Sequence, residues 1–170
     1  MKTTVSRILI VLLVLSSVLT LAASPNNHGV QFTPFTGNEQ ATGIIDPGTM
    51  KFVDGIIITT GLVVSEVDDM TDDRVDGIAE VTVNSVYKAP PADQPPFFGT
   101  GPNWGTGHLP NPGGAWNIRF EGHQYDGCRS VIHGRGSGVG GYEGLKAVWE
   151  WRSDSCMFTS TVTGYIIEHE

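Results

Sequence analysis

The chain has 170 residues, of which 18 are Asp or Glu and 10 are Lys or Arg, so its net charge is −8. This acidic balance argues against nucleic acid as a partner, because phosphate binding depends on Lys and Arg, and equally against an anionic membrane surface. The length and the 39% hydrophobic content fit one folded domain.

Residues 1–23 have the pattern of a secretory signal peptide. Lys2 and Arg7 precede an apolar run of 14 residues, Ile8 to Leu21, and small residues follow at positions 22–24. The order of basic, apolar and small residues predicts cleavage and export, and the run is short for a membrane-spanning helix, which needs ~20 residues. We therefore expect a secreted or periplasmic protein that keeps no membrane contact after cleavage. An uncleaved anchor is the alternative.

The mature chain would be more acidic still, and it would hold only two cysteines. Residues 1–23 carry two basic and no acidic side chains, so the remainder has eight basic against 18 acidic residues, a charge of −10. Cys128 and Cys156 are an even number in an exported chain, which predicts a disulfide bond, with free thiols as the alternative. A disulfide that closes about 30 residues stabilises by roughly 3–4 kcal/mol.

In chain order, residues 24–41 are rich in Asn, Gly, Pro and Thr and suggest a loose lead-in with one short strand, Val30 to Thr33. The barrel domain is expected over residues 42–170. Gly55 to Val67 is a continuous β-branched run, which predicts a strand buried on both faces or a long strand bent at Gly61.

The next strand, Asp76 to Lys88, alternates between apolar and polar residues, and the acidic turn Asp68 to Arg74 joins it to the preceding strand as a hairpin. A Pro- and Gly-rich excursion follows over Ala89 to Gly114, with one possible strand, Gly105 to Leu109. Four further strands are predicted: Ala115 to His123, Cys128 to Gly136, Leu145 to Arg152 and Cys156 to Glu168.

These patterns predict an all-β fold: a single antiparallel β-barrel of seven to nine strands, preceded by a signal-peptide helix. A sandwich is the alternative, but closure is favoured because it removes exposed strand edges. The last three strands form a meander whose first and third members run in the same direction. The predicted Cys128–Cys156 disulfide would therefore join them at one rim of the barrel.

The C-terminal stretch Gly134 to Ile166 combines a Gly-rich turn, the sequence GYEG, an aromatic strand and a Thr-rich strand that contains TGYI. It resembles the C-terminal hairpins of allene oxide cyclase-like and dirigent-like β-barrels, and also small secreted bacterial proteins. The Gly spacing before Tyr142 departs from the G-x-G-x-Y/F-x-G element of those barrels. The resemblance implies a β-barrel; its known activities are isomerisation of a fatty epoxide and guidance of phenoxy radical coupling, and none of their functional residues can be placed here.

The alternating strands also supply the candidate ligand-binding residues. Aromatic side chains on the apolar faces would line a lumen for a small apolar molecule or simply fill the core. Polar side chains on the opposite face would form a pocket with acid–base capacity if they turned inward, and an ordinary solvated face if they pointed outward. The candidates are Trp116, Phe120, Trp149 and Trp151 from the first group and Arg119, Glu121, His123 and His133 from the second.

No catalytic residue, cofactor or metal site is expected. Gly136, Gly138 and Gly141 match G-x-G-x-x-G, but a strand follows where a nucleotide-binding loop needs a helix, so a hairpin turn is predicted. Three isolated histidines (His108, His123 and His133) lack the spacing of metal ligands. A weak surface calcium site on the acidic turn, at Asp68, Asp69, Asp72 and Asp73, is the alternative to a solvated loop.

The functional prediction is a secreted, non-enzymatic β-barrel that binds a small apolar ligand or serves a structural role. One alternative is an isomerase or cyclase that acts in the lumen. The other is a carbohydrate- or protein-interaction module that uses the excursion around Pro95 to Pro112. The sequence does not indicate an oligomeric state.

Overall fold

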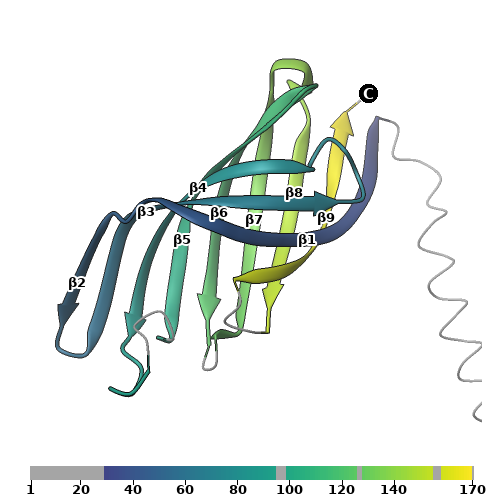
Figure 1. Ribbon diagram of the computed structural model, residues 1–170. Coiled ribbons are helices and arrows are strands. Elements are labelled where there is room, and N and C mark those ends of the chain that lie inside the picture. The colour runs from purple at the N-terminus through teal and green to yellow at the C-terminus, as the bar shows by residue number, and fades with distance from the viewer. Residues whose placement is uncertain (1–28, 95–98, 126–127, 155–157, 170) are drawn as a thin grey trace, which may run out of the picture. The chain divides into compact units, whose positions relative to one another are not determined.

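A computed structural model describes residues 29–94, 99–125, 128–154 and 158–169 of the chain, so the predicted signal peptide over residues 1–23 lies outside it. Within these ranges the chain consists of β-strands and one short 3-10 turn (Figure 1). The elements are β1 (Val30–Asp46), β2 (Thr49–Val53), β3 (Ile56–Met70), β4 (Gly77–Lys88), β5 (Gly101–Asn111), β6 (Gly114–Gln124), β7 (Ser130–Val139), η3 (Gly140–Tyr142), β8 (Lys146–Ser153) and β9 (Thr159–His169).

Eight of these strands close into an antiparallel barrel, and β2 lies outside it. The strand order is β1-β9-β8-β7-β6-β5-β4-β3-β2, and β1 also pairs with β3, which completes the ring. The second half of β3 pairs with β1, and its first half pairs with β2. The predicted bend in β3 is confirmed at Gly61, where φ is +70° and the register with β4 shifts between Thr59 and Leu62. The prediction of a single antiparallel barrel is likewise confirmed.

The lead-in expected over residues 24–41 differs from the structure. From Val30 onward this segment is the first part of β1, and Gly37 to Asp46 pair with β3. This segment is rich in Asn, Gly, Pro and Thr, so its residue pattern gives little sign of a strand. The side chains that point inward include the fully buried Phe35.

Strand β5 is also longer than predicted, and it contains two residues that were expected to lie outside it, Pro102 and Pro110. Its ladder with β4 covers only Asn103 to His108, so both prolines lie beyond that ladder, where a missing N–H breaks no bond to β4.

One end of the barrel is filled by aromatic side chains. The ring of Trp149 lies 5.9 Å from the ring of Phe35 and 5.9 Å from the ring of Trp116, and Trp116 contacts Tyr142 at 5.5 Å. Aromatic contacts of this kind contribute beyond the burial of their area. The large side chains with the least exposure are Trp116, Phe35, Leu109, Ile166, Val75 and Val162.

Glycines in the barrel wall make room for these rings. A Cβ atom at Gly134 would lie 2.4 Å from the ring of Trp151, and one at Gly136 would lie 2.5 Å from the ring of Trp149. Both indoles therefore lie directly against the backbone of β7. The Gly-rich stretch forms the end of β7 and, through η3, the predicted hairpin turn before β8. Gly136 and Gly138, which were expected in that turn, belong to β7.

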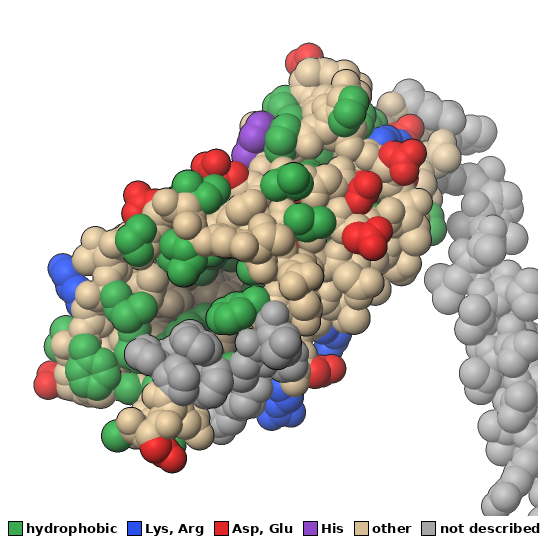
Figure 2. All heavy atoms as spheres, viewed as in Figure 1, with side chains coloured by type: hydrophobic (Ala, Val, Ile, Leu, Met, Phe, Trp, Pro, Cys, Tyr) green, Lys and Arg blue, Asp and Glu red, His purple; other side chains and the backbone are tan. Residues whose placement is uncertain are grey.

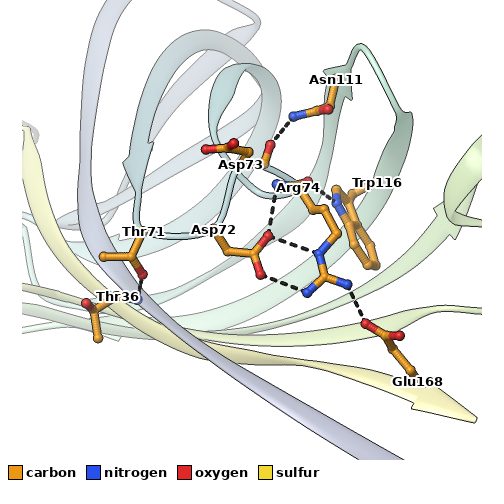
Figure 3. A network of polar contacts seen from close by, with 8 residues as sticks. All are labelled: Thr36, Thr71, Asp72, Asp73, Arg74, Asn111, Trp116 and Glu168. Atoms are coloured by element: carbon orange, nitrogen blue, oxygen red, sulfur yellow. Dashed lines mark hydrogen bonds and ion pairs between the residues drawn. The ribbon is translucent and has the colours of Figure 1, made fainter.

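The β3–β4 connection folds over the filled end and is fixed there by polar contacts (Figure 3). The Arg74 guanidinium donates two hydrogen bonds to Asp72, at 3.0 and 2.8 Å, and forms an ion pair with Glu168 of β9. The Trp116 indole N–H donates to the Arg74 carbonyl at 2.6 Å. The Arg74 contact lowers the pKa of Asp72.

A second contact ties the same connection to β5. The Asn111 amide donates to the carbonyls of Asp73 and Asp76, and the Tyr142 hydroxyl donates to Asn111 at 2.6 Å. The buried Val75 lies between these anchors, so the filled end is closed by main-chain and side-chain bonds together.

Hydrophobic side chains gather on the surface at the end of the sheet that carries β2 (Figure 2). Five of them are at least half exposed: Ile44, Ile45, Met50, Phe52 and Val53. Among the described residues there is no helix of sufficient length and hydropathy to span a bilayer.

Candidate functional site

The half of the barrel away from the aromatic cluster is hollow. A cavity of about 90 Å³ is lined by residues of β1, β3, β4, β5, β6, β7 and β8. A second cavity, of about 150 Å³, shares Glu39, Glu66 and Ile132 with the first and extends to Cys128 and Ser153. Those last two residues lie at the rim opposite the β3–β4 connection, so the hollow runs from mid-barrel toward that rim.

Three carboxylic acids line the first cavity. Glu39 comes from β1, and Glu66 and Asp68 come from β3. In the register of these strands Asp68 lies beside Glu39, and Glu66 lies opposite Ala41. Side chains two apart share a strand face, so the pleat that directs the apolar Val64 inward also directs both β3 acids inward.

Asp68 is buried and Glu39 and Glu66 are half-buried, and this burial raises the pKa of all three carboxyl groups. It raises the pKa of Asp68 to about 7, with repulsion from Asp76 as the smaller cause. It raises the pKa of Glu66 to about 8, with repulsion from Asp68 second. The pKa of Glu39 is raised as well, first by burial and then by Glu66 and Asp68. No Lys, Arg or His among the described residues lines either cavity.

Polar atoms in this hollow lack partners within the described chain. Asp68 Oδ1, Asn103 Oδ1 and Trp151 Nε1 are buried without a hydrogen bond of normal geometry, although Trp151 lies close enough to Glu39 to offset part of the rise in the pKa of that carboxyl. The other end of the Asn103 amide is satisfied, because its Nδ2 donates to the Tyr87 hydroxyl at 3.1 Å. Leaving a buried polar group unbonded costs about 1–3 kcal/mol. Asp68, Asn103 and Trp151 all line the first cavity, so a bound molecule could satisfy all three atoms.

The structure does not bring all eight predicted ligand-binding residues to one site, but five of them line a groove on the outer face: Arg119, Phe120, Glu121, His133 and Trp149. Phe120 and Trp151 line the first cavity, whereas Trp116 and Trp149 belong to the aromatic cluster of the filled end. The four polar candidates follow the outward alternation of β6 and β7. They are Arg119, Glu121, His123 and His133.

The outer face of β4 to β8 is a broad polar groove. Glu121 lies opposite His133 in it, and Arg119 lies opposite Arg135. At the edge of the groove, charged side chains pair with one another. Glu150 accepts a hydrogen bond from Arg152 at 2.6 Å, and its carboxylate lies 3.6 Å from His133 Nδ1. This arrangement is that of a solvated sheet face.

A smaller surface groove, of about 430 Å³, lies next to this face. It is lined by Trp104, His123 and Tyr125 among others, and the rings of His123 and Tyr125 lie 4.6 Å apart. These exposed aromatics are the feature that the interaction-module alternative would use.

The acidic turn does not offer its four carboxylates to one surface ion. Asp68 is only 7% exposed and points into the barrel, while Asp72 is bonded to Arg74. No group of three potential metal ligands occurs in the part of the chain that the structure describes.

Cys128 is buried at the start of β7, near the rim. Cys156 lies outside the described residues, so the disulfide stays a prediction.

Sequence reasoning missed Glu39, Glu66, Asp68 and Asn103. The residue pattern places Asp68 in the hairpin turn, whereas β3 continues through it to Met70. One pattern in the sequence does indicate that the β3 acids point inward. Every second residue lies on the same face of β3, and this face has two acids between two apolar residues: Val64, Glu66, Asp68 and Met70. No comparable signal marked Glu39.

No family model, curated protein or solved structure matches the chain. The resemblance to allene oxide cyclase-like and dirigent-like barrels therefore stays a prediction.

Proposed function

We propose that this protein binds a small molecule inside the barrel without transforming it. The hollow half of the lumen carries the proposal, since the side chains of Phe120, Ile132 and Trp151 provide an apolar wall and buried polar atoms there are unbonded. Concave, mainly apolar sites with a few converging polar groups are the usual form of small-molecule sites. The opposite end is closed, and the second cavity extends toward the Cys128 rim.

Blocking the cavity should abolish binding while leaving the fold intact. Ile132 lines both cavities, so Ile132→Trp would place a large ring in them. Val131 is its neighbour on the opposite face of β7, and Val131→Trp is the matched control. Mass spectrometry of small molecules that co-purify with each protein is the measurement.

We expect the unmodified protein and Val131→Trp to carry the same ligand and Ile132→Trp to carry none. Equal recovery from both folded variants would place the ligand elsewhere, and recovery of nothing from the unmodified protein would contradict the proposal.

We further propose that the mature protein is exported and that Cys128 and Cys156 form a disulfide bond. The pairing of Ser130 with Ser153 supports this, because it brings the start of β7 next to the end of β8 at one rim. The intact mass of the protein purified from an exported source should be lower by two hydrogen atoms than its mass after reduction. Alkylation of both thiols without prior reduction would contradict the disulfide.

A lumen isomerase or cyclase is the second candidate, favoured by the presence of Glu66 and Asp68 in the cavity. A carboxyl whose pKa lies near the working pH suits general acid–base catalysis, and burial raises the pKa of Asp68 to about 7. A product that differs from the added molecule, lost in Asp68→Asn while binding persists, would establish the enzyme instead of the binding protein.

A further inference from the structure

We propose that the cavity selects a small organic cation, whose ammonium group is held by Glu39, Glu66 and Asp68. This inference rests on the proposed function and names the chemical class of its ligand. Three observations support it: the balance of donors and acceptors, the absence of an opposing charge, and the apolar wall beside the acids.

With its carboxyl groups ionised, the hollow has more hydrogen-bond acceptors than donors. Asn103 presents its carbonyl oxygen, since its amide N–H already donates to Tyr87. The three carboxyl groups accept when ionised. Trp151 Nε1 is the unbonded donor of the set. The ligand that satisfies the ionised site is therefore mainly a donor, and an ammonium group presents up to three N–H bonds.

The ionisable groups of the site also favour a cation over a neutral or anionic ligand. Apart from Cys128, for which a disulfide bond is proposed above, the ionisable groups in the cavity linings are Glu39 on β1 and Glu66 and Asp68 on β3. Asp76 acts on Asp68 from the β3–β4 connection. Acids buried without a counter-charge remain protonated rather than ionise, and a cation placed among them favours the ionised form. Without a cation nearby, the carboxyl groups are therefore protonated. When a cationic ligand binds, they would ionise and balance its charge.

The other wall fits the body of an organic molecule better than a bare ion. Phe120 and Trp151 present rings to the same cavity as the acids, and aromatic faces attract cations as well as alkyl groups. In the described chain no trio of side chains has the geometry of a metal site. The first cavity, of about 90 Å³, and the adjoining one, of about 150 Å³, share Glu39, Glu66 and Ile132, and together they restrict the ligand to a small amine.

Benzylamine, benzyl alcohol and benzoate form a matched set of probes with one ring and different charge. Isothermal titration calorimetry of the full mature protein should show benzylamine binding about 10- to 100-fold more tightly than benzyl alcohol, the ratio expected for a hydrogen bond to a charged group. Benzoate should not bind. The pair Glu66→Gln/Asp68→Asn should remove the preference, and Glu80→Gln, an exposed acid on β4, should keep it.

Proton release provides a readout that requires no variant. Titrations at pH 7 in buffers of different ionisation enthalpy should show about one proton released per benzylamine and none per benzyl alcohol. The affinity for benzylamine should rise as the pH passes through 7 and 8, where Asp68 and Glu66 ionise.

Equal binding of benzyl alcohol and benzylamine, or benzylamine binding without proton release, would overturn the cation and leave the proposed function standing. A preference retained in the folded double variant would do the same. Binding of none of the three probes, together with no co-purifying ligand, would overturn both proposals.

Discussion

Replacing Trp116 by alanine is expected to lower the free energy of unfolding by about 3–5 kcal/mol, the usual cost of truncating a fully buried aromatic residue. Trp116 has no exposed surface and contacts Trp149 and Tyr142. Its N–H also fixes the β3–β4 connection through the Arg74 carbonyl. The substitution therefore opens a cavity and releases the loop that covers this end. Urea unfolding followed by circular dichroism measures the change.

Trp104 is the matched control for this substitution. It lies on β5, the neighbour of β6, and is 44% exposed. Trp104→Ala should change the free energy of unfolding by no more than about 0.5 kcal/mol, as is usual for surface sites. Equal losses in the two variants would contradict the distinction between a filled core and an exposed face.

The barrel should become less stable as the pH rises from 5 to 8.5, the reverse of the usual behaviour of acidic side chains. The pKa of Asp68 is raised from 3.8 to about 7 and that of Glu66 from 4.5 to about 8. Because the folded state binds more protons than the unfolded chain in this range, stability is fully present below about pH 4 and is lost as the pH rises through the folded pKa values. Each unit of pKa difference corresponds to about 1.4 kcal/mol, so the total is on the order of several kcal/mol.

Other groups limit the effect at low pH. Arg74 holds the pKa of Asp72 below its ordinary value, so the contribution of that pair is lost as the pH falls, and maximal stability is expected near pH 5. Urea midpoints at several pH values measure the slope. Asp68→Asn should flatten it, and Asp69→Asn, an exposed position on the same strand, should not. A midpoint that rises between pH 5 and 8 would show that these acids are ionised in the folded protein.

Strands β4, β6, β8 and β9 could be predicted because their apolar residues alternate. Val162 and Ile166 of β9 and Trp149 of β8 are buried where the alternation places them. Strand β1 could not be predicted in the same way, since its inward row of Phe35, Gly37 and Glu39 has only one large apolar member.

The candidate site was hard to predict for a related reason. Its defining residues break the rule that ionisable groups face water: Glu39, Glu66 and Asp68 are strand residues on the inner face. The local sequence pattern shows which side chains lie on the same face of a strand. Only closure of the barrel decides which of the two faces points into the lumen. That closure depends on the β1–β3 pairing, which joins segments that no short-range pattern connects.

The glycines of β7 have a consequence for the empty half of the barrel. At Gly134 the indole of Trp151 occupies the space of an absent methyl group, and the same indole borders the cavity. A side chain there would move the ring by about 1 Å toward the axis, given ordinary van der Waals separation. The width of the cavity therefore depends on the absence of a side chain at Gly134 in the barrel wall. Although Gly134 does not line the cavity, it limits the size of the ligand that the cavity can hold.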